Sequence, residues 1–311
     1  MLSRVANNLF WLEKYFVRSH SLLNLIKANY LSNLDINGIS PWDKTVRNYT
    51  GKSIDELQLK ETDSIDIIQF LLFENQHPNS LINLIEKTRQ NARSVQEHVS
   101  KEIWLNINKY YHFIHQYNLP LRFIDQDPIS IIDEMLMYNM LHYSNADINQ
   151  ERGNAYCFMN LGKYIERLSQ SIDFLLLQTS HTNKSFDKLE EHIFWKNLLI
   201  SVGGYQQFVK TYKSVFYLNN VIEFIVLNPF FPNSIYYCLQ KISVHIERLN
   251  KFNDINPINN LSFKIDKLES TMRYTKIEDL KAIGLEPFLD NLKSEVILLN
   301  QEVNTIYFNN I

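Results

Sequence analysis

Charged residues that could bind an anion lie within apolar helical patterns at several points of the sequence. Arg18 falls inside an apolar stripe, Glu166 and Arg167 are adjacent within another, and Arg89 and Arg93 stand four residues apart. A guanidinium among apolar and aromatic side chains needs a carboxylate, carbonyl groups or an anionic ligand. We therefore take Arg18, Arg89, Arg93, Glu166 and Arg167 as the candidate site.

Two interpretations of these five residues remain open. They form either a buried ionic layer that fixes how helices register, or an open site that holds a carboxylate or phosphate. In the second case the chain could be an enzyme, with Glu166 as general acid or base. For Arg89 and Arg93 the structural interpretation predicts a Glu-Arg-Arg-Glu ladder, because Glu86 and Glu97 lie one turn outside them.

Motifs for other chemistry are weak. His112 and His115 share a helix face, and Glu74 with His77 has an E-x-x-H spacing, but neither pair has further ligands in sequence pattern. Gly203-Gly204 lacks the pattern of a nucleotide-binding loop, and no nucleophile motif is present. The sequence predicts no metal site and no cofactor.

Composition narrows the class of protein. The 311 residues include 45% hydrophobic and 21% charged residues, with a formal net charge of −3. A near-neutral chain has no overall field for nucleic acid or acidic membranes, and no stretch is apolar enough to span a bilayer. The two cysteines, Cys157 and Cys238, form no C-x-x-C pair and are expected to be core thiols. We expect a cytoplasmic protein that binds neither nucleic acid nor membrane.

The hydrophobic pattern has the period of helices throughout. Apolar residues recur at steps of three and four over residues 5–26, and a second stripe on the same segment predicts a helix covered on both sides. A long helix is predicted over 80–117, a loop over 118–127 and a helix over 128–143. No segment alternates with period two, so the predicted class is all-α, a multi-helix bundle.

An internal repeat is visible in the sequence. L-x-K-Y-x-x-R occurs at 12–18 and at 161–167, Trp42 aligns with Trp195, and P-N-S occurs at 78–80 and 232–234. The matches keep their order, with offsets that drift only from 149 to 154. We predict one all-α domain over 1–311. It contains repeat units at about 1–118 and 151–252, a connector at 119–150 and C-terminal helices at 253–311. The units would be related by a pseudo-two-fold axis, unless two amphipathic helices match by coincidence.

These motifs resemble those of the alpha-E family, an all-α family known mainly from bacterial genomes. Residues 1–15 are similar to the family's opening nearly throughout, and Glu166-Arg167 resembles the Glu-Arg pair for which the family is named. Residues 88–93 are similar to its A-R-x-N-A-R, and 231–234 to its F-P-R-S. Trp104, with Asn106 and Asn108, lies where the family has a Trp and an Asn on one helix.

The chain departs from the family pattern mainly in its first half. Val17 precedes Arg18 where a glutamate is common, Glu13 stands where glycine is usual, and Lys14 replaces an arginine. Asn233 also replaces an arginine. A charged site carried by the first half would therefore be partly eroded.

The resemblance also implies a setting. The family occurs beside, and sometimes fused to, circularly permuted ATP-grasp proteins and transglutaminase-like proteins. It therefore implies a component of a peptide- or amide-bond-forming system. We expect a non-catalytic helical accessory protein whose partner is an ATP-grasp-type ligase or a transglutaminase-like protein. The alternative is an enzyme on a peptide or anionic substrate, with Glu166 as acid or base and the arginines holding a carboxylate or phosphate.

Overall fold

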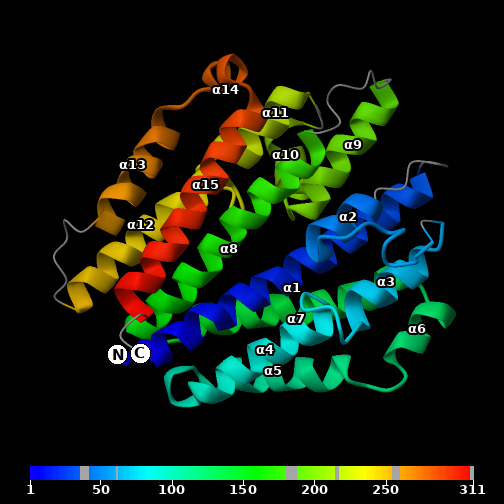
Figure 1. Ribbon diagram of the computed structural model, residues 1–311, viewed down its shortest axis with the longest axis horizontal. Helices are drawn as coiled ribbons and strands as arrows, with labels where there is room; N and C mark the ends of the chain where they lie inside the picture. Colours follow the sequence, from blue (N-terminus) through cyan, green and yellow to red (C-terminus); the bar gives the residue numbers. More distant parts are fainter. Residues whose placement is uncertain (36–41, 61, 180–187, 214–216, 254–259, 309–311) are drawn as a thin grey trace. The chain divides into compact units, whose positions relative to one another are not determined.

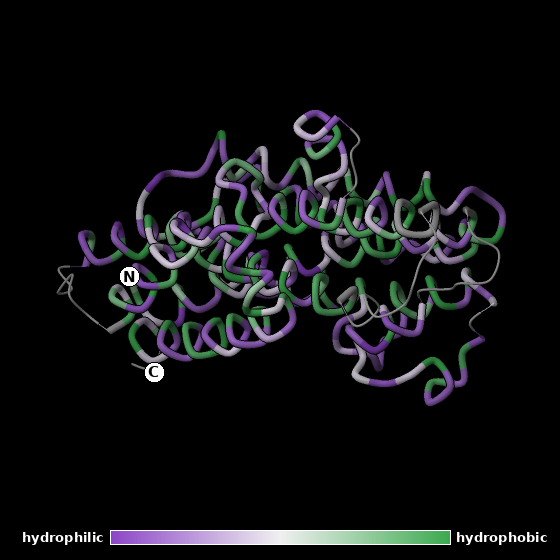
Figure 2. The backbone as a smooth tube through the Cα atoms, turned by 90° about the horizontal axis from the view of Figure 1, so that it is seen from above, coloured by the Kyte–Doolittle hydropathy of each residue, from purple (hydrophilic) through white to green (hydrophobic). Residues whose placement is uncertain are grey.

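The computed structural model describes residues 1–35, 42–60, 62–179, 188–213, 217–253 and 260–308, and these ranges contain helices and no strand (Figure 1). The predicted all-α class is confirmed. Individual helices carry both hydrophobic and hydrophilic residues along their length (Figure 2), as amphipathic helices do. None of the described helices combines the length and apolarity needed to cross a membrane.

The chain divides into two compact units. The N-terminal unit is Trp11–Glu151, and the C-terminal unit is Arg152–Ile311 together with Met1–Phe10. Helix α1 (Ser3–Asp35) contributes its first turns to the C-terminal unit and the rest to the N-terminal unit. The predicted connector 119–150 thus falls in the N-terminal unit and the C-terminal helices fall in the C-terminal unit.

The remaining helices follow in chain order. Those of the N-terminal unit are α2 (Trp42–Thr50), α3 (Ser64–Phe73), α4 (Leu81–Ser94), the 3-10 turn Gln96–His98, α5 (Lys101–Ile114), α6 (Leu119–Asp125) and α7 (Pro128–Ile148). Those of the C-terminal unit are α8 (Asn154–Thr179), α9 (Lys188–Ser201), α10 (Tyr205–Tyr212), α11 (Leu218–Ile222), the π-turn Glu223–Leu227, α12 (Ile235–Phe252), α13 (Asn260–Tyr274), α14 (Ile277–Ile283), α15 (Leu285–Val303) and the π-turn Asn304–Phe308.

The long helix predicted over 80–117 is wrong, because it breaks between α4 and α5. Ser100 caps α5 by accepting the N–H of Ile103 at 3.3 Å. Gln150 holds the break from the end of α7: its Oε1 accepts the N–H of Ser100 and its Nε2 donates to the carbonyl of His98, both at 2.9 Å. A side chain 50 residues away therefore stabilises a turn that the local pattern does not contain.

The loop predicted over 118–127 is also wrong in part, since it contains α6. Pro120 lies in the first turn of α6, where its missing N–H costs nothing. Gln69 of α3 donates from Nε2 to the Pro120 carbonyl at 3.0 Å. Packing against α3 thus favours a short helix that is too short to be stable alone.

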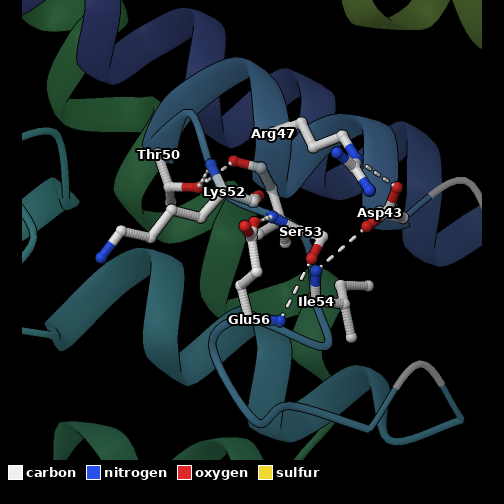
Figure 3. Close-up of polar contacts among 8 residues, drawn as sticks. Asp43, Arg47, Thr50, Lys52, Ser53, Ile54 and Glu56 are labelled. Carbon is white, nitrogen blue, oxygen red and sulfur yellow. Dashed lines mark hydrogen bonds and ion pairs between the residues drawn. The ribbon is translucent and has the colours of Figure 1, made fainter.

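The segment after α2 is held by side chains of α2 and of the segment itself (Figure 3). Asp43 accepts hydrogen bonds from Arg47 Nε at 2.6 Å and from the Ile54 N–H at 3.0 Å. Burial acts to raise the pKa of Asp43, but these hydrogen bonds and the Arg47 charge lower it below its usual value. Ser53 and Glu56 close the turn by exchanging bonds from each backbone N–H to the other's side chain.

The turns that precede α4 and α12 have the same backbone hydrogen bond. The N–H of Ser80 donates to the carbonyl of His77 at 3.0 Å, and the N–H of Ser234 donates to that of Phe231 at 2.9 Å. Both serines are N-cap residues with extended backbone, at ψ 152° and 151°. These positions are aligned by the P-N-S motif.

The asparagine of each P-N-S motif also makes one contact in common. Asn79 Nδ2 donates to the Tyr49 carbonyl at 3.0 Å, and Asn233 Nδ2 donates to the Val202 carbonyl at 2.8 Å. Tyr49 lies in the last turn of α2, and Val202 follows α9 directly. Each unit therefore ties its P-N-S turn to the end of the helix that carries its aligned tryptophan.

A pair of stacked rings lies beside each of these turns. Phe70 stacks on His77 with ring centroids 5.8 Å apart, and Phe224 stacks on Phe231 at 4.5 Å. His77 and Phe231 are buried. In each pair the two rings are seven residues apart in the sequence. The aligned residues of the two units therefore share ring packing as well as backbone hydrogen bonds.

Gly162 allows a close approach of two helices in the C-terminal unit. A Cβ at this position would lie against the Phe10 carbonyl group of α1, 3.0 Å from its carbon and 3.2 Å from the Phe10 Cα, with the carbonyl oxygen nearer still. The atoms in the way belong to a helix backbone, which cannot rotate aside. Glycine at 162 is therefore required by packing.

We predict that Gly162→Ala lowers the free energy of unfolding by about 1–3 kcal/mol, because it overpacks the contact between α1 and α8. Helix propensity alone would give the opposite sign, a gain of about 1 kcal/mol. Urea unfolding followed by circular dichroism measures the difference. Ser169→Ala on the same helix is the control. A stabilised Gly162→Ala would contradict the contact.

Candidate functional site

Helix α8 directs the adjacent Glu166 and Arg167 to different surroundings, as residues about 100° apart on a helix must be. Glu166 is 2% exposed and accepts a hydrogen bond from Gln170 Nε2 at 3.1 Å. Arg167 is partly exposed, and its guanidinium carbon lies 5.7 Å from the centre of the Tyr164 ring. The glutamate belongs to the interior and the arginine to its edge.

Helix α12 packs along α8 and carries three side chains of interest at intervals of four residues. Tyr237, Lys241 and His245 therefore share one face of α12. The Tyr237 ring meets the Tyr164 ring edge-on at 6.0 Å, and the His245 ring stacks on Tyr164 at 6.1 Å. Tyr164 thus joins the two helices.

Cations lie over the tyrosine rings of this face. Lys163 Nζ is 4.8 Å from the centre of the Tyr164 ring, and Lys241 Nζ is 5.0 Å from that of Tyr237. Such contacts hold an ammonium without removing its charge. We call the following residues the α8–α12 cluster: Lys163, Tyr164, Arg167, Tyr237, Lys241, His245 and Arg248.

The pKa of His245 reflects its burial and the electrostatic potential inside the α8–α12 cluster. Burial, followed by the positive charges of Lys163, Arg248 and Lys241, lowers its pKa to about 3. Every charged group that shifts this pKa is a cation. The imidazole is 5% exposed, and within the described ranges its Nδ1 has no hydrogen-bond partner. A neutral histidine therefore sits in a positive field.

The other reactive groups nearby favour binding over catalysis. Burial raises the pKa of the Cys238 thiol to about 12, although Arg167 and Lys163 act in the opposite direction. The thiol is therefore not a nucleophile near neutral pH. Glu166, the candidate acid or base, is nearly inaccessible to water. The exposed edge of the cluster offers cations and tyrosines, which suit an anionic group.

In the N-terminal unit, helices α1 and α4 place similar groups together. Lys87 Nζ of α4 is 5.5 Å from the centre of the Tyr15 ring of α1 and donates to the Pro78 carbonyl at 2.7 Å. Arg18 Nη1 donates to Asn79 Oδ1 at 3.3 Å. Burial and then the Arg18 charge lower the pKa of Lys87. Here too a lysine lies over a tyrosine next to an arginine.

The predicted Glu-Arg-Arg-Glu ladder on α4 is wrong. Glu86 accepts from Gln90 Nε2 at 3.1 Å, and Glu97 lies 3.6 Å from His98 Nε2. Arg89 instead donates from Nε to Asn108 of α5 at 2.7 Å. Arg93 is exposed, and in the described part of the chain it forms no ion pair.

The five predicted site residues are divided between the units. Arg18, Arg89 and Arg93 belong to the N-terminal unit, and Glu166 and Arg167 to the C-terminal unit. Within each unit the motifs do meet, since Arg18 reaches the P-N-S turn and Arg89 reaches Asn108. No group of three or more His, Cys, Asp or Glu in the described ranges could hold a metal ion.

Sequence reasoning missed the contribution of α12. The Glu-Arg pair is not unique, since Glu151-Arg152 and Glu247-Arg248 also occur. The Arg152 guanidinium lies 4.2 Å from the centre of the Tyr156 ring, which meets the His245 ring edge-on at 5.7 Å. Arg152 and Arg167 each lie beside a tyrosine that contacts the His245 ring, and the charge of Arg248 lowers the His245 pKa. The recurrence of the dipeptide was the signal that could have pointed to them.

The family model for Alpha-E, a predicted alpha-helical domain with a conserved ER motif, matches residues 1–308. This chain belongs to the Alpha-E family. Neither the curated proteins nor the solved structures contain a match. The family description agrees with the helical architecture, and Glu166-Arg167 is one of three Glu-Arg pairs in this Alpha-E chain.

One departure from the Alpha-E pattern has a structural explanation. Glu13, where the family usually has glycine, is 2% exposed and lies 2.8 Å from Nε2 of the fully buried His142. The His142 ring stacks on Phe16 at 3.9 Å. A carboxylate on the buried side of α1 is thus compensated by α7.

We predict that Glu13→Leu and His142→Leu each lower the free energy of unfolding by about 3 kcal/mol, because each leaves a buried polar partner. The double variant should cost less than the two single variants together. A double-mutant cycle from urea unfolding measures the coupling. Lys251→Ala, which breaks the exposed pair with Glu247, is the control and should cost under about 1 kcal/mol. Strictly additive losses would contradict a coupled pair.

We predict that His245 stays neutral until the pH approaches 3, as NMR titration of its imidazole would show. Lys241→Met should raise this pKa, since one acting cation is removed, whereas Lys251→Met should leave it unchanged. A wild-type pKa near the ordinary 6.5 would contradict the positive cluster.

The same depressed pKa predicts how stability varies with pH. Unfolded His245 binds a proton below about pH 6.5, while the folded form does not until about pH 3. Stability is therefore fully present above pH 6.5 and falls as the pH decreases between these values, by up to about 1.4 kcal/mol per pH unit. His245→Gln should flatten this part of the stability curve.

Proposed function

We propose that this Alpha-E chain is a non-catalytic accessory protein that binds an anionic group of a peptide or partner protein at the α8–α12 cluster. The observation that carries the proposal is the neutral, buried His245 surrounded by cations. A carboxylate or phosphate at the exposed edge would relieve the repulsion among these cations. Enzyme action through Glu166 is less favoured, because its carboxylate is 2% exposed.

We further propose that the partner belongs to a peptide- or amide-bond-forming system, as an ATP-grasp-type ligase or a transglutaminase-like protein. The support for this is the resemblance to the family and its usual setting. Such systems handle carboxylates, which matches the chemistry of the cluster. The accessory role would be to hold an acidic segment of the substrate or of the ligase.

Internal duplication is part of the same proposal. The P-N-S turns, their asparagine contacts and their stacked rings recur at aligned positions in the two units. A lysine also lies over a tyrosine in each unit. These shared contacts support descent of both units from one helical ancestor.

We predict that Lys241→Gln reduces capture of the ligase-type partner about tenfold, the loss expected when one charge-assisted hydrogen bond is removed. The tagged protein is used for affinity capture from lysate of its source cells, with and without Mg-ATP, and captured proteins are identified by mass spectrometry. Lys241 suits this test because its ammonium lies over Tyr237 at the cluster's edge and forms no ion pair with a described residue.

Lys251→Gln is the matched control, since it lies on the same helix outside the cluster and pairs with Glu247. Capture of an ATP-grasp or transglutaminase-like protein by the wild type and this control, but not by Lys241→Gln, is the expected result. Equal capture by all three would exclude the cluster as the contact. Absence of both protein classes would exclude the partner assignment.

A further inference from the structure

Arg89 is held in a fixed orientation on the surface formed by α4 and α5. Its Nε donates to Asn108 Oδ1 at 2.7 Å, and its guanidinium carbon lies 4.4 Å from the centre of the Tyr111 ring. The same guanidinium carbon lies 6.0 Å from the centre of the ring of Trp104, which is on α5 with Tyr111. Two aromatic rings and one amide thus position a side chain that ordinarily has many rotamers.

Three arginines in the described ranges pair with carboxylates. The nitrogen-to-oxygen distances are 2.6 Å for Arg47 and Asp43, 2.7 Å for Arg122 and Glu134, and 2.8 Å for Arg273 and Glu269. Arg89 differs from these three because its hydrogen bond goes to a neutral amide. Within the described part of the chain it forms no ion pair, and neither Nη group has a hydrogen-bond partner.

The neighbouring charged side chains on α4 do not pair with Arg89. Glu86, one turn before it, accepts from Gln90. Arg93, one turn after it on the same face, is a second cation that is exposed and has no ion pair with a described residue. Two like charges at this spacing repel each other, so an anion that contacts both would stabilise the helix surface.

The remaining edge of the Arg89 guanidinium has the geometry for one class of ligand. With Nε bound to Asn108, the two Nη groups present parallel N–H donors in the plane of the group. A carboxylate has two acceptor oxygens at a matching separation, so it can accept both bonds at once. Because the fork is already ordered by Tyr111 and Asn108, binding would lose little side-chain entropy.

We propose that Arg89, supported by Asn108, Tyr111 and Trp104 and assisted by Arg93, is a carboxylate-binding site for an acidic peptide. The carboxylate belongs to a glutamate or aspartate side chain or to a peptide C-terminus. The site lies in the N-terminal unit, whereas the α8–α12 cluster lies in the C-terminal unit, and it rests on separate residues. It remains a binding site whether or not the α8–α12 cluster binds a partner.

The first test follows the Arg89 Nε–Hε signal by NMR in protein labelled with 15N-arginine. The probes are a tri-glutamate peptide with both ends blocked, an acetylated tri-alanine with a free C-terminus, a blocked tri-glutamine and inorganic phosphate. We expect a saturable shift with tri-glutamate, with tri-alanine or with both, and none with tri-glutamine. The two carboxylate probes distinguish a side-chain ligand from a C-terminal one.

The Arg122 signal is the internal control, because its guanidinium is already paired with Glu134 and bonded to Gln126. Equal shifts of the Arg89 and Arg122 signals would show that the probes act only by changing the ionic strength, and this would overturn the proposal. Phosphate that binds as well as the carboxylates would overturn the assignment of ligand class. A signal that moves with none of the probes would overturn the site itself.

The second test uses variants, with the indole N–H of Trp104 as the reporter. Arg89→Lys keeps the charge but removes the planar fork, so it should weaken tri-glutamate binding about tenfold. Arg122→Lys is the matched control and should bind as the wild type does. Binding by Arg89→Lys within about twofold of the wild type would overturn the fork geometry.

Lys241→Gln separates this site from the proposed function. It should leave the Arg89 titration unchanged, and loss of the titration in that variant would overturn the independence of the two sites. A failed Arg89 titration would leave the affinity capture by the α8–α12 cluster standing. The two proposals can therefore fail separately.

Discussion

Burial of the Glu166 carboxylate on the inner side of α8 is the constraint on which the C-terminal unit depends. A carboxylate removed from water must gain hydrogen bonds or cations, or it destabilises the fold by several kcal/mol. Gln170 supplies one bond from the next turn of the same helix. Lys163 and Arg167 lie on the same helix, and both contact the ring of Tyr164 through cation–π interactions. The interior charge and the cationic edge therefore belong to one arrangement.

The N-terminal unit accommodates charge on a similar helix in another way. Glycine at 162 lets a helix backbone approach closely in the C-terminal unit, whereas the aligned Glu13 places a carboxylate inside the N-terminal unit. There His142 from α7 provides the hydrogen bond and Phe16 covers its ring. A departure from the family pattern that suggests an eroded site is thus compensated as part of a core. The aligned position has a packing role in both units.

The sequence predicts features that depend on neighbouring residues better than features that depend on residues far away in the chain. The all-α class and α7 follow from hydrophobic period, which sequence shows directly. The break before α5 does not, because Gln150 stabilises it from 50 positions away. For the same reason the sequence shows that Arg18 and Arg89 need polar partners, but it does not show that Asn79 and Asn108 are those partners. Periodicity gives the face of a helix and not its neighbour.

A surface that binds an anion differs from a structural ion network in the partners of its cations. In a network each cation would have a carboxylate within 4 Å, as Arg122 and Arg273 do. Lys241 and Arg89 are instead held by aromatic rings, which fix position while leaving the charge uncompensated. That arrangement costs stability through repulsion. Beside Lys241, the pKa of His245 is lowered first by burial and then by the charges of Lys163, Arg248 and Lys241. Such a cost is expected where the fold prepares a surface for an anion that comes from outside the chain.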